Sequence, residues 1–180
     1  MNDKRSLRRW FRQRRKQQGD VSDAIASAAL EVIASFTTGR IGLYVPLIGE
    51  ADLRSLRRRA STPMALPRAD REGGLTYLPW DDDDLTPDGC GIPAPATGAA
   101  LLPEQLSLLL VPALAVDTRG IRLGYGGGYY DRLRADPAWA AVPAWVVLPS
   151  TCLSDHPLPK EPWDVPFDGW ITEWGAGRRG

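Results

Sequence analysis

The sequence predicts an α/β fold in which residues 1–180 form a single three-layer α/β/α domain, with helices on both faces of a mainly parallel sheet. Three observations predict it. The length of 180 residues suits one domain with a substantial core. Short apolar runs of strand length alternate with segments in which apolar residues recur every three or four positions. Residues 106–111 are apolar except for Ser107, which is typical of a strand buried on both faces.

The N-terminal half contains two expected helices. The first spans residues 3–17, with Leu7, Trp10 and Phe11 on its apolar side and arginines elsewhere. The second spans residues 23–36 and follows Ser22, a residue type that caps helices by accepting backbone hydrogen bonds. The other elements expected in this half are strands over 41–45, 64–66 and 75–78 and a helix over 50–60.

The C-terminal half follows a segment rich in Asp, Pro, Gly and Ala, residues 81–103, which we expect to form a long surface loop. The buried strand over 106–111 comes next, and a glycine-rich turn follows it. The remaining elements expected here are a helix over 127–135 and strands over 145–148 and 169–172.

Composition restricts the function. The formal net charge is zero, which argues against a general nucleic-acid binder. Eight of the 22 basic residues lie between Lys4 and Lys16, so a local basic patch can still bind one anionic ligand. Cys90 and Cys152 have no zinc-like spacing and suit a reducing cytosol. No apolar stretch approaches the roughly 20 residues of a membrane-spanning helix. We therefore expect a cytoplasmic monomer without membrane or nucleic-acid partners.

A glycine cluster lies between the buried strand and the following helix, where four of the five residues from Gly124 to Gly128 are glycine. Each glycine costs roughly 0.5–1 kcal/mol relative to alanine in regular structure, so the cluster indicates a backbone that bends sharply or approaches a ligand closely. Backbone N–H groups at the start of a helix bind phosphate, and Arg122 can add a charge-assisted hydrogen bond. Neither a Walker A motif nor GxGxxG fits this segment. A tight turn without a ligand is the alternative interpretation.

The run Arg122-Leu-Gly-Tyr-Gly-Gly-Gly-Tyr-Tyr-Asp-Arg132, preceded by Gly120, closely resembles the signature of the 5-formyltetrahydrofolate cyclo-ligase family, also called methenyltetrahydrofolate synthetases. The resemblance extends over nearly the whole chain and is weak between residues 60 and 105. The other similar segments are Lys4–Arg8, Tyr44–Glu50, Val111–Asp117, Trp163–Asp168 and Ile171–Glu173. The chain departs from the family pattern near two expected ligand regions, where Ala94 replaces a usual Glu and Trp163 a usual His.

The resemblance implies an ATP- and Mg²⁺-dependent ligase of folate one-carbon metabolism. It implies conversion of 5-formyltetrahydrofolate, with or without further glutamates, into 5,10-methenyltetrahydrofolate with release of ADP and phosphate. The formyl oxygen attacks the γ-phosphate, and N10 then attacks the resulting imidoyl phosphate. Such a reaction depends on alignment, on positive charge around the phosphates and on shelter from water.

The resemblance also implies roles for individual residues. The expected catalytic residues are Arg122, Tyr130 and Asp131. The expected ATP-binding residues are Lys4, Arg8, Arg122, Leu123, Gly124, Tyr125, Gly126, Gly127, Gly128, Tyr129 and Tyr130. The expected folate contacts are Tyr44, Val45, Glu50, Tyr125 and Tyr129. Asp131 and Asp164 resemble the magnesium ligands, in line with the preference of that ion for carboxylate oxygen.

The basic residues of the first helix have a second interpretation. Lys4 and Arg8 lie four residues apart and share one helix face, so both can reach the same phosphates. A solvated basic helix shows the same spacing. Arg9, Arg12 and Arg15 are expected to face water for the most part.

The other assignments have structural alternatives too. Asp131 and Glu50 can simply stabilise the start of a helix, Asp164 can hold a turn, and each tyrosine can simply pack. Trp80 can cover a pterin ring but is more typical of a core residue. The residues to which we assign no role are His156 and the run Asp81–Asp84, the latter typical of a solvated loop.

Two other functions stay open on the sequence. One is a related ATP-using enzyme with a different substrate, since Ala94 and Trp163 alter the expected pocket. The other is a phosphate- or RNA-binding module without turnover, built from the basic helix and the glycine cluster. Asp131 and Asp164 argue against it, because acids near phosphates do not help simple anion binding.

Overall fold

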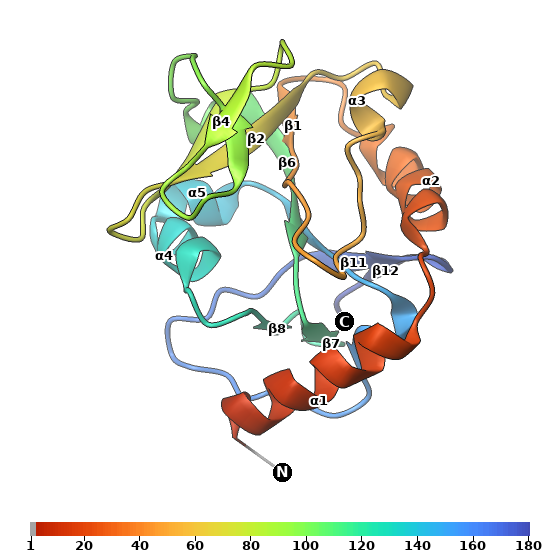
Figure 1. Cartoon of the computed structure of the whole chain (residues 1–180). Coiled ribbons are helices and arrows are strands. Elements are labelled where there is room, and N and C mark those ends of the chain that lie inside the picture. The colour runs from red at the N-terminus through yellow and green to blue at the C-terminus, as the bar shows by residue number, and fades with distance from the viewer. Residues whose placement is uncertain (1–2) are drawn as a thin grey trace.

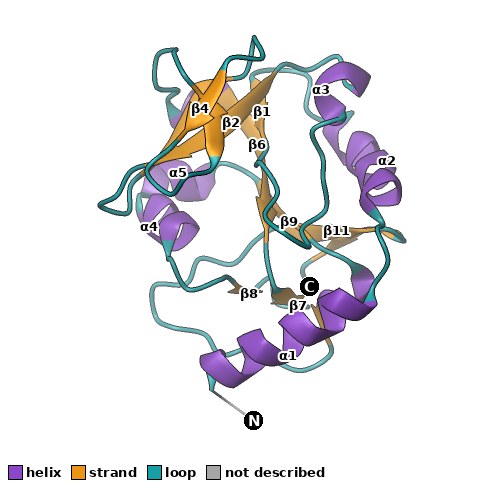
Figure 2. Ribbon diagram, in the orientation of Figure 1, coloured by secondary structure: helices purple, strands orange, loops and turns teal. Residues whose placement is uncertain are grey.

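The computed structural model describes residues 3–180 and has a seven-stranded sheet at its centre (Figure 1, Figure 2). The inner strands are parallel to one another, and the strand at each edge is antiparallel to its neighbour. In spatial order the strands are β12 (Gly175–Arg178), β11 (Gly169–Thr172), β9 (Ala144–Val147), β6 (Leu106–Pro112), β1 (Arg40–Gly42), β2 (Met64–Ala69) and β3 (Leu75–Pro79). The predicted α/β class with a mainly parallel sheet is confirmed.

Smaller elements surround this sheet. Strands β10 (Leu153–Ser154), β7 (Ala115–Asp117) and β8 (Arg122–Leu123) form a three-stranded sheet, and β4 (Leu85–Pro87) pairs with β5 (Pro93–Pro95). The helices are α1 (Lys4–Gln17), α2 (Ser22–Ile33), α3 (Leu56–Arg59), α4 (Tyr129–Ala135) and α5 (Pro137–Ala141), with 3-10 turns η1 (Pro103–Gln105) and η2 (Ser150–Cys152). Among residues 3–180, none of the helices has both the length and the apolar character needed to cross a membrane.

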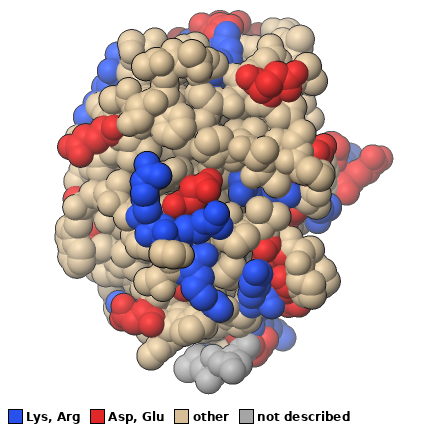
Figure 3. All heavy atoms as spheres, turned by 180° about the vertical axis from the view of Figure 1, so that it is seen from behind, with Lys and Arg blue, Asp and Glu red and all other residues tan. Residues whose placement is uncertain are grey.

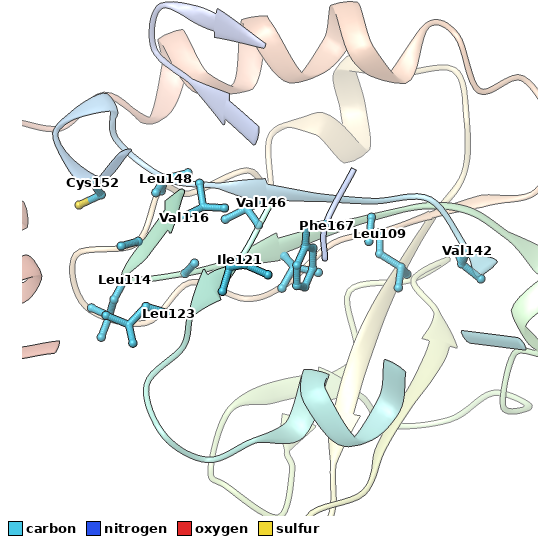
Figure 4. Close-up of a cluster of buried hydrophobic side chains, with 14 of the residues drawn as sticks. Leu109, Leu114, Val116, Ile121, Leu123, Val142, Val146, Leu148, Cys152 and Phe167 are labelled. Carbon is cyan, nitrogen blue, oxygen red and sulfur yellow. The ribbon is translucent and has the colours of Figure 1, made fainter. Parts of the chain in front are cut away.

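Alternate residues of β6 face two separate hydrophobic cores. Leu109 and Val111 pack in one core with residues of α4 and α5, whereas Leu108 and Leu110 pack in the other with residues of α2 and α3. Helices therefore lie on both faces of the sheet (Figure 1). Figure 4 shows part of the first core, around the labelled Leu109 and Phe167. The predicted two-sided burial of residues 106–111 follows from this alternation.

Helix α1 runs across one end of the sheet (Figure 1). Phe11 is buried in the first core, and Leu7 packs against the same core from a partly buried position. Trp10 is 40% exposed and makes an edge-on contact with Phe11 at a centroid distance of 4.5 Å. The expectation that Trp10 lies on the apolar side is therefore wrong, because only Phe11 of this adjacent aromatic pair points at the core.

The cap expected at Ser22 is also wrong. Ser22 is the first residue of α2, and its hydroxyl accepts a hydrogen bond from the backbone N–H of Asp52 at 2.9 Å. The Ser22 backbone N–H donates to the carboxylate of Asp20 at 2.9 Å. A tertiary contact with the segment before α3 thus replaces the local capping bond.

Several expected boundaries need correction. The strand expected over 41–45 ends at Gly42, and the helix expected over 50–60 is reduced to the four residues of α3. The second helix ends at Ile33, and the loop expected over 81–103 contains the β4–β5 hairpin. The elements that were not expected are β7, β8, β10, β12 and α5.

Candidate active site

A pocket of about 420 Å³ opens at the carboxyl end of the parallel strands. Val45 lies beyond β1, Ala69 ends β2, and Pro112 ends β6, and all three line this pocket. The chain leaves β1 toward β2 and β3, then returns to place β6 on the other side of β1 and continues to β9. The sheet order therefore reverses between β1 and β6, and open α/β sheets bind ligands at such a reversal.

Every residue with a predicted binding or catalytic role lines this one pocket. They are Lys4, Arg8, Tyr44, Val45, Glu50, Arg122, Leu123, Gly124, Tyr125, Gly126, Gly127, Gly128, Tyr129, Tyr130, Asp131 and Asp164. Residues from both ends and the middle of the chain thus meet in a single cavity. The individual roles stay predictions, because a position in the pocket wall does not reveal which group a side chain binds.

The glycine cluster requires glycine at two of its positions. Gly126 has φ 110° and Gly128 has φ 70°, a region of backbone conformation that side chains with a Cβ rarely adopt. A Cβ on Gly128 would lie 2.8 Å from the Nη1 atom of Arg132, whereas one on Gly126 would meet only Arg8 at 3.6 Å. Gly128 is the residue before α4, so the left-handed turn directs the chain into that helix. The sequence prediction of a sharp bend here is confirmed.

Arg122 lies in the pocket wall but is largely occupied by protein partners. Its Nη1 donates to the Pro112 carbonyl at 3.1 Å, and its Nη2 donates to Asp131 Oδ1 at 3.1 Å. The side chain is 6% exposed, and the guanidinium lies over the Tyr130 ring at 5.2 Å. In the described structure, Arg122 therefore connects the end of β6 to α4, which is a structural task in addition to the predicted phosphate contact.

Lys4 and Arg8 enter the pocket from α1. Arg8 Nε donates to the Gly124 carbonyl at 2.9 Å, and no partner for its Nη atoms occurs within residues 3–180. Lys4 Nζ lies 3.2 Å from Glu161 Oε1 and 3.6 Å from Asp164 Oδ2. The helix thereby presents two cations beside the glycine cluster, as the four-residue spacing predicted.

The two predicted magnesium ligands carry other interactions in this structure. Asp131 pairs with Arg122, while Asp164 Oδ2 lies near Lys4 and also accepts a hydrogen bond from the Glu161 N–H at 2.8 Å. No cluster of three or more His, Cys, Asp or Glu side chains suited to a metal occurs in the described part of the chain. Two carboxylates still fit Mg²⁺, since this ion is commonly bound by one or two carboxylates together with substrate phosphates and water.

Glu50 lies in the loop after β1, and burial raises the pKa of its carboxyl group. The Leu47 N–H donates to Oε2 at 2.8 Å, which lowers that pKa in part, and the nearby Tyr125 hydroxyl acts in the same direction. Oε1 is buried and has no hydrogen-bond partner among residues 3–180. An unpaired buried acceptor is costly unless a ligand supplies the donor, which makes Glu50 a good candidate for substrate contact.

The pocket tyrosines are held in different ways. The Tyr44 hydroxyl donates to the Ala51 carbonyl at 2.7 Å, and the side chain is only 2% exposed, so Tyr44 mainly supports the loop that carries Glu50. Tyr129 is 2.9 Å from the thiol of Cys90. Burial raises the pKa of Tyr130, which keeps its hydroxyl protonated at neutral pH. The Tyr125 hydroxyl accepts a hydrogen bond from Arg15.

Arg15 corrects an expectation about the first helix. Arg9 and Arg12 are exposed, as expected, but Arg15 is 7% exposed and points inward. Besides the Tyr125 contact, its Nη2 donates to the Ala113 carbonyl. Both partners lie about a hundred residues away in sequence, so the local pattern of basic residues carries no sign of them.

Part of the pocket wall was not predicted at all. These residues are Leu47, Pro67, Ala69, Leu75, Asp88, Cys90, Ile92 and Pro112. Many belong to the region between residues 60 and 105, where the family resemblance is weak. The Asp88-Gly89 pair was an available signal, because Asp88 accepts backbone hydrogen bonds from Ala69, Cys90 and Ile92 and so shapes this wall.

The two departures from the family pattern do not alter the described pocket. Ala94 is fully buried, and Trp163 is 64% exposed, and neither lines the cavity. Trp80 is buried in the second core under the Arg57 guanidinium, which confirms the core interpretation. His156 is exposed and lies outside the pocket.

Charged side chains are unevenly distributed over the surface. Figure 3 shows the rear face, where Lys and Arg side chains gather in the lower middle, with Asp or Glu side chains among them. Most of the rest of this face is uncharged. Basic and acidic groups therefore lie side by side on this face, and no uniformly basic surface covers it.

Comparison with known proteins shows the family of the chain. The 5-formyltetrahydrofolate cyclo-ligase family model matches residues 1–173. The 5-formyltetrahydrofolate cyclo-ligase of Haemophilus influenzae is 31% identical over 164 residues, covering 84% of each chain. That of Escherichia coli K12 is 27% identical over 178 residues, covering 90% of this chain and 96% of its own.

Two solved structures share the fold. The NMR structure of Aquifex aeolicus 5,10-methenyltetrahydrofolate synthetase superposes with a TM-score of 0.79 at 26% identity, over 97% of this chain and 92% of its own. A 5,10-methenyltetrahydrofolate synthetase from Mycoplasma pneumoniae gives a TM-score of 0.74 at 19% identity, over 95% of this chain and 99% of its own, and so supports the fold alone. Because the family model spans almost the whole sequence, the chain belongs to the 5-formyltetrahydrofolate cyclo-ligase family and is an enzyme.

Proposed function

We propose that residues 1–180 form a single domain that uses ATP and Mg²⁺ to convert 5-formyltetrahydrofolate into 5,10-methenyltetrahydrofolate, ADP and phosphate. The observation that carries the proposal is the composition of the pocket. Its wall combines two cations of α1, the glycine cluster and two carboxylates with Glu50, several tyrosines and apolar side chains. A phosphate-bearing ligand and an aromatic, hydrogen-bonding ligand can therefore meet in one cavity.

The phosphate half of the pocket is built around Gly124–Gly128. The side-chain-free backbone at Gly126 leaves open space, since a Cβ there would meet no atom closer than 3.6 Å. Lys4 and the Nη atoms of Arg8 supply positive charge beside it. Charge-assisted hydrogen bonds from such groups hold phosphate oxygens and offset the charge that develops during transfer.

Asp131 and Asp164 would hold the magnesium ion in this half. When bound with the nucleotide, the ion neutralises phosphate charge and orients the γ-phosphate. The pairing of Asp131 with Arg122 and of Asp164 with Lys4 positions both carboxylates. Simple anion binding would gain nothing from these acids, so their presence supports nucleotide turnover over a phosphate- or RNA-binding module.

The folate half lies toward Glu50. Its unpartnered Oε1 can accept a hydrogen bond from an N–H group of the pterin ring, which satisfies the buried oxygen. Val45, Leu47 and Ile92 provide apolar contact surface for a flat ring. The resulting alignment would bring the formyl oxygen to the phosphate half.

The direct test is incubation with 5-formyltetrahydrofolate, ATP and Mg²⁺ while the near-ultraviolet absorbance of the methenyl product is followed. We expect product only when nucleotide and divalent metal are both present. Full turnover in excess chelator would overturn the metal role. Nucleotide binding without any methenyl product would favour an ATP-using enzyme with another substrate. A cytoplasmic, monomeric protein without nucleic-acid or membrane partners stays part of the proposal.

A further inference from the structure

Arg15 is a buried cation that forms no salt bridge within residues 3–180. Its side chain is only 7% exposed. Its Nη1 donates to the Tyr125 hydroxyl and its Nη2 to the Ala113 carbonyl, while Nε is buried and has no hydrogen-bond partner among the described residues. Burying a charge in this way is unfavourable unless its hydrogen bonds achieve something that an apolar side chain would not.

Three contacts of Arg15 are with walls of the pocket or with their supports. Tyr125 lies in the glycine cluster, and Ala113 follows β6. The third contact is with the loop that carries Glu50. A Cβ on Gly49 would lie 3.2 Å from Arg15 Cδ, so this loop passes directly over the aliphatic part of the arginine side chain. Gly49 itself has φ 84°. One side chain therefore contacts three segments that converge on the pocket.

The chemistry of the guanidinium determines how the Tyr125 hydroxyl is oriented. An arginine side chain can only donate hydrogen bonds, so the Tyr125 oxygen must be the acceptor in this pair. The hydroxyl proton of Tyr125 is then directed away from Arg15. Tyr125 and Glu50 line the same pocket, and Gly49, next to Glu50, lies against the aliphatic part of the Arg15 side chain. Arg15 thus leaves the Tyr125 proton free for an acceptor in the pocket that Tyr125 shares with Glu50.

We propose that Arg15 is a positioning residue for folate binding: by occupying the Tyr125 oxygen, it directs the Tyr125 proton toward Glu50 and the substrate held there. The proposal rests on the proposed function, because it concerns affinity for 5-formyltetrahydrofolate. It is independent of the phosphate contacts assigned to Lys4 and Arg8, since Arg15 lies about two turns beyond Arg8 on α1 and does not line the pocket.

The test compares Arg15→Met, Tyr125→Phe and the double variant. Kinetic constants for both substrates and the melting temperature are measured for each protein. We expect each single variant to raise the Michaelis constant for 5-formyltetrahydrofolate about tenfold, as for loss of one charge-assisted contact. The Michaelis constant for ATP should change less than about twofold, because both changes leave the backbone N–H groups of Gly124–Gly128 in place. The double variant should be no worse than either single variant, because both changes break the same chain of hydrogen bonds.

Two further variants separate positioning from simple packing. Arg15→Lys keeps the charge but replaces a planar guanidinium, which donates to two oxygens, with a single ammonium group. The Michaelis constant for 5-formyltetrahydrofolate should therefore stay raised, while the melting temperature largely recovers relative to Arg15→Met. Arg14→Met is the matched control on the same helix. Its guanidinium stacks on Trp10 at 4.6 Å, outside the pocket, and its loss should leave both Michaelis constants unchanged.

The outcomes are distinguishable. Wild-type protein that neither binds nor converts 5-formyltetrahydrofolate would overturn the proposed function and this inference with it. If the wild type is active and the Michaelis constant for 5-formyltetrahydrofolate is unchanged in Arg15→Met and Tyr125→Phe, only the inference is overturned. Multiplicative losses in the double variant, or full recovery of the folate constant in Arg15→Lys, would also overturn it. Tyr125→Phe removes a single oxygen and so decides the matter even if Arg15→Met folds poorly.

Discussion

Replacing Lys4 and Arg8 together with alanine should weaken ATP binding specifically. Both side chains line the pocket from α1, next to the glycine cluster. Arg8 Nε donates a hydrogen bond to the Gly124 carbonyl. The two Nη groups of Arg8 have no partner among residues 3–180 and can therefore bind a ligand. Lys4 has a 29% exposed side chain and lies near two acids, so it can turn toward a phosphate with little rearrangement.

The size of the effect follows from these contacts. A hydrogen bond to a charged group contributes about 1.5–3 kcal/mol, and partial exposure of both side chains reduces that value by screening. Taking ~1.4 kcal/mol for the pair as a lower bound gives at least about a tenfold increase in the Michaelis constant for ATP. The ion pairs of Lys4 are themselves partly exposed, and pairs of that kind contribute about 0–1 kcal/mol, so the melting temperature should change little.

The control removes the same charge from the solvent side of the helix. Arg5→Ala with Arg9→Ala suits this purpose, because both residues are exposed and neither lines the pocket. Arg12 is a poorer choice, since its guanidinium lies 5.9 Å from the centre of the Tyr125 ring. The Michaelis constant for ATP is measured for both double variants at low and high salt. We expect the control to match the wild type at both.

Equal loss of ATP affinity in both double variants, fading with salt, would contradict a specific contact, because the helix would then act only through its electric field. Unchanged ATP affinity in both double variants would mean that the contacts of Lys4 and Arg8 are purely structural.

Three more predictions follow from single positions. Gly126→Val should weaken ATP binding far more than folate binding in calorimetric titrations, because φ is 110° at Gly126 and the valine side chain would fill space beside the phosphates. Arg122→Ala should have the same effect. Unchanged ATP affinity in both variants would mean that the glycine cluster is only a turn. Glu50→Gln should raise the melting temperature relative to wild type at about pH 7 but not at about pH 4. The pKa of Glu50 is raised above its ordinary 4.5, so the stability of the wild type falls as pH rises through that raised pKa. An equal difference in melting temperature at both pH values would contradict this. Gly42→Ala should lower the free energy of unfolding by about 1–3 kcal/mol in a denaturant titration, because its Cβ would lie 2.7 Å from the buried Tyr77 ring. A variant as stable as the wild type would show that the core rearranges to accommodate the methyl group.

The sequence predicted those features that depend on neighbouring residues. Residues 106–111 are apolar except for Ser107, and a strand with a core on each face buries nearly all of such a run. The left-handed turns at Gly126 and Gly128 were likewise visible as glycines where other residues would be strained. The meeting of the site residues in one pocket was predictable because the segments that resemble the family extend from Lys4 to Asp164.

The features that sequence did not reveal depend on distant partners. The strand after Arg40 ends at Gly42 because the chain then leaves the sheet to form the pocket loop with Val45 and Glu50. The wall between residues 60 and 105 consists of short apolar segments without a motif. Arg15 is the clearest case, because its burial depends on Tyr125 and on a carbonyl beyond β6.

The inward stripe of α1 explains why hydrophobic spacing describes this helix incompletely. Lys4, Arg8, Phe11 and Arg15 follow the spacing of one helix face, and all four point at the protein. On most surface helices this stripe is apolar because it faces a core. Here Phe11 meets the core, with Leu7 packed beside it, while the three cations contact Asp164, the glycine cluster and the loop that carries Glu50. The proposed ligand site beneath the helix accounts for this polar stripe, because Lys4 and Arg8 line the pocket while Arg15 supports its wall.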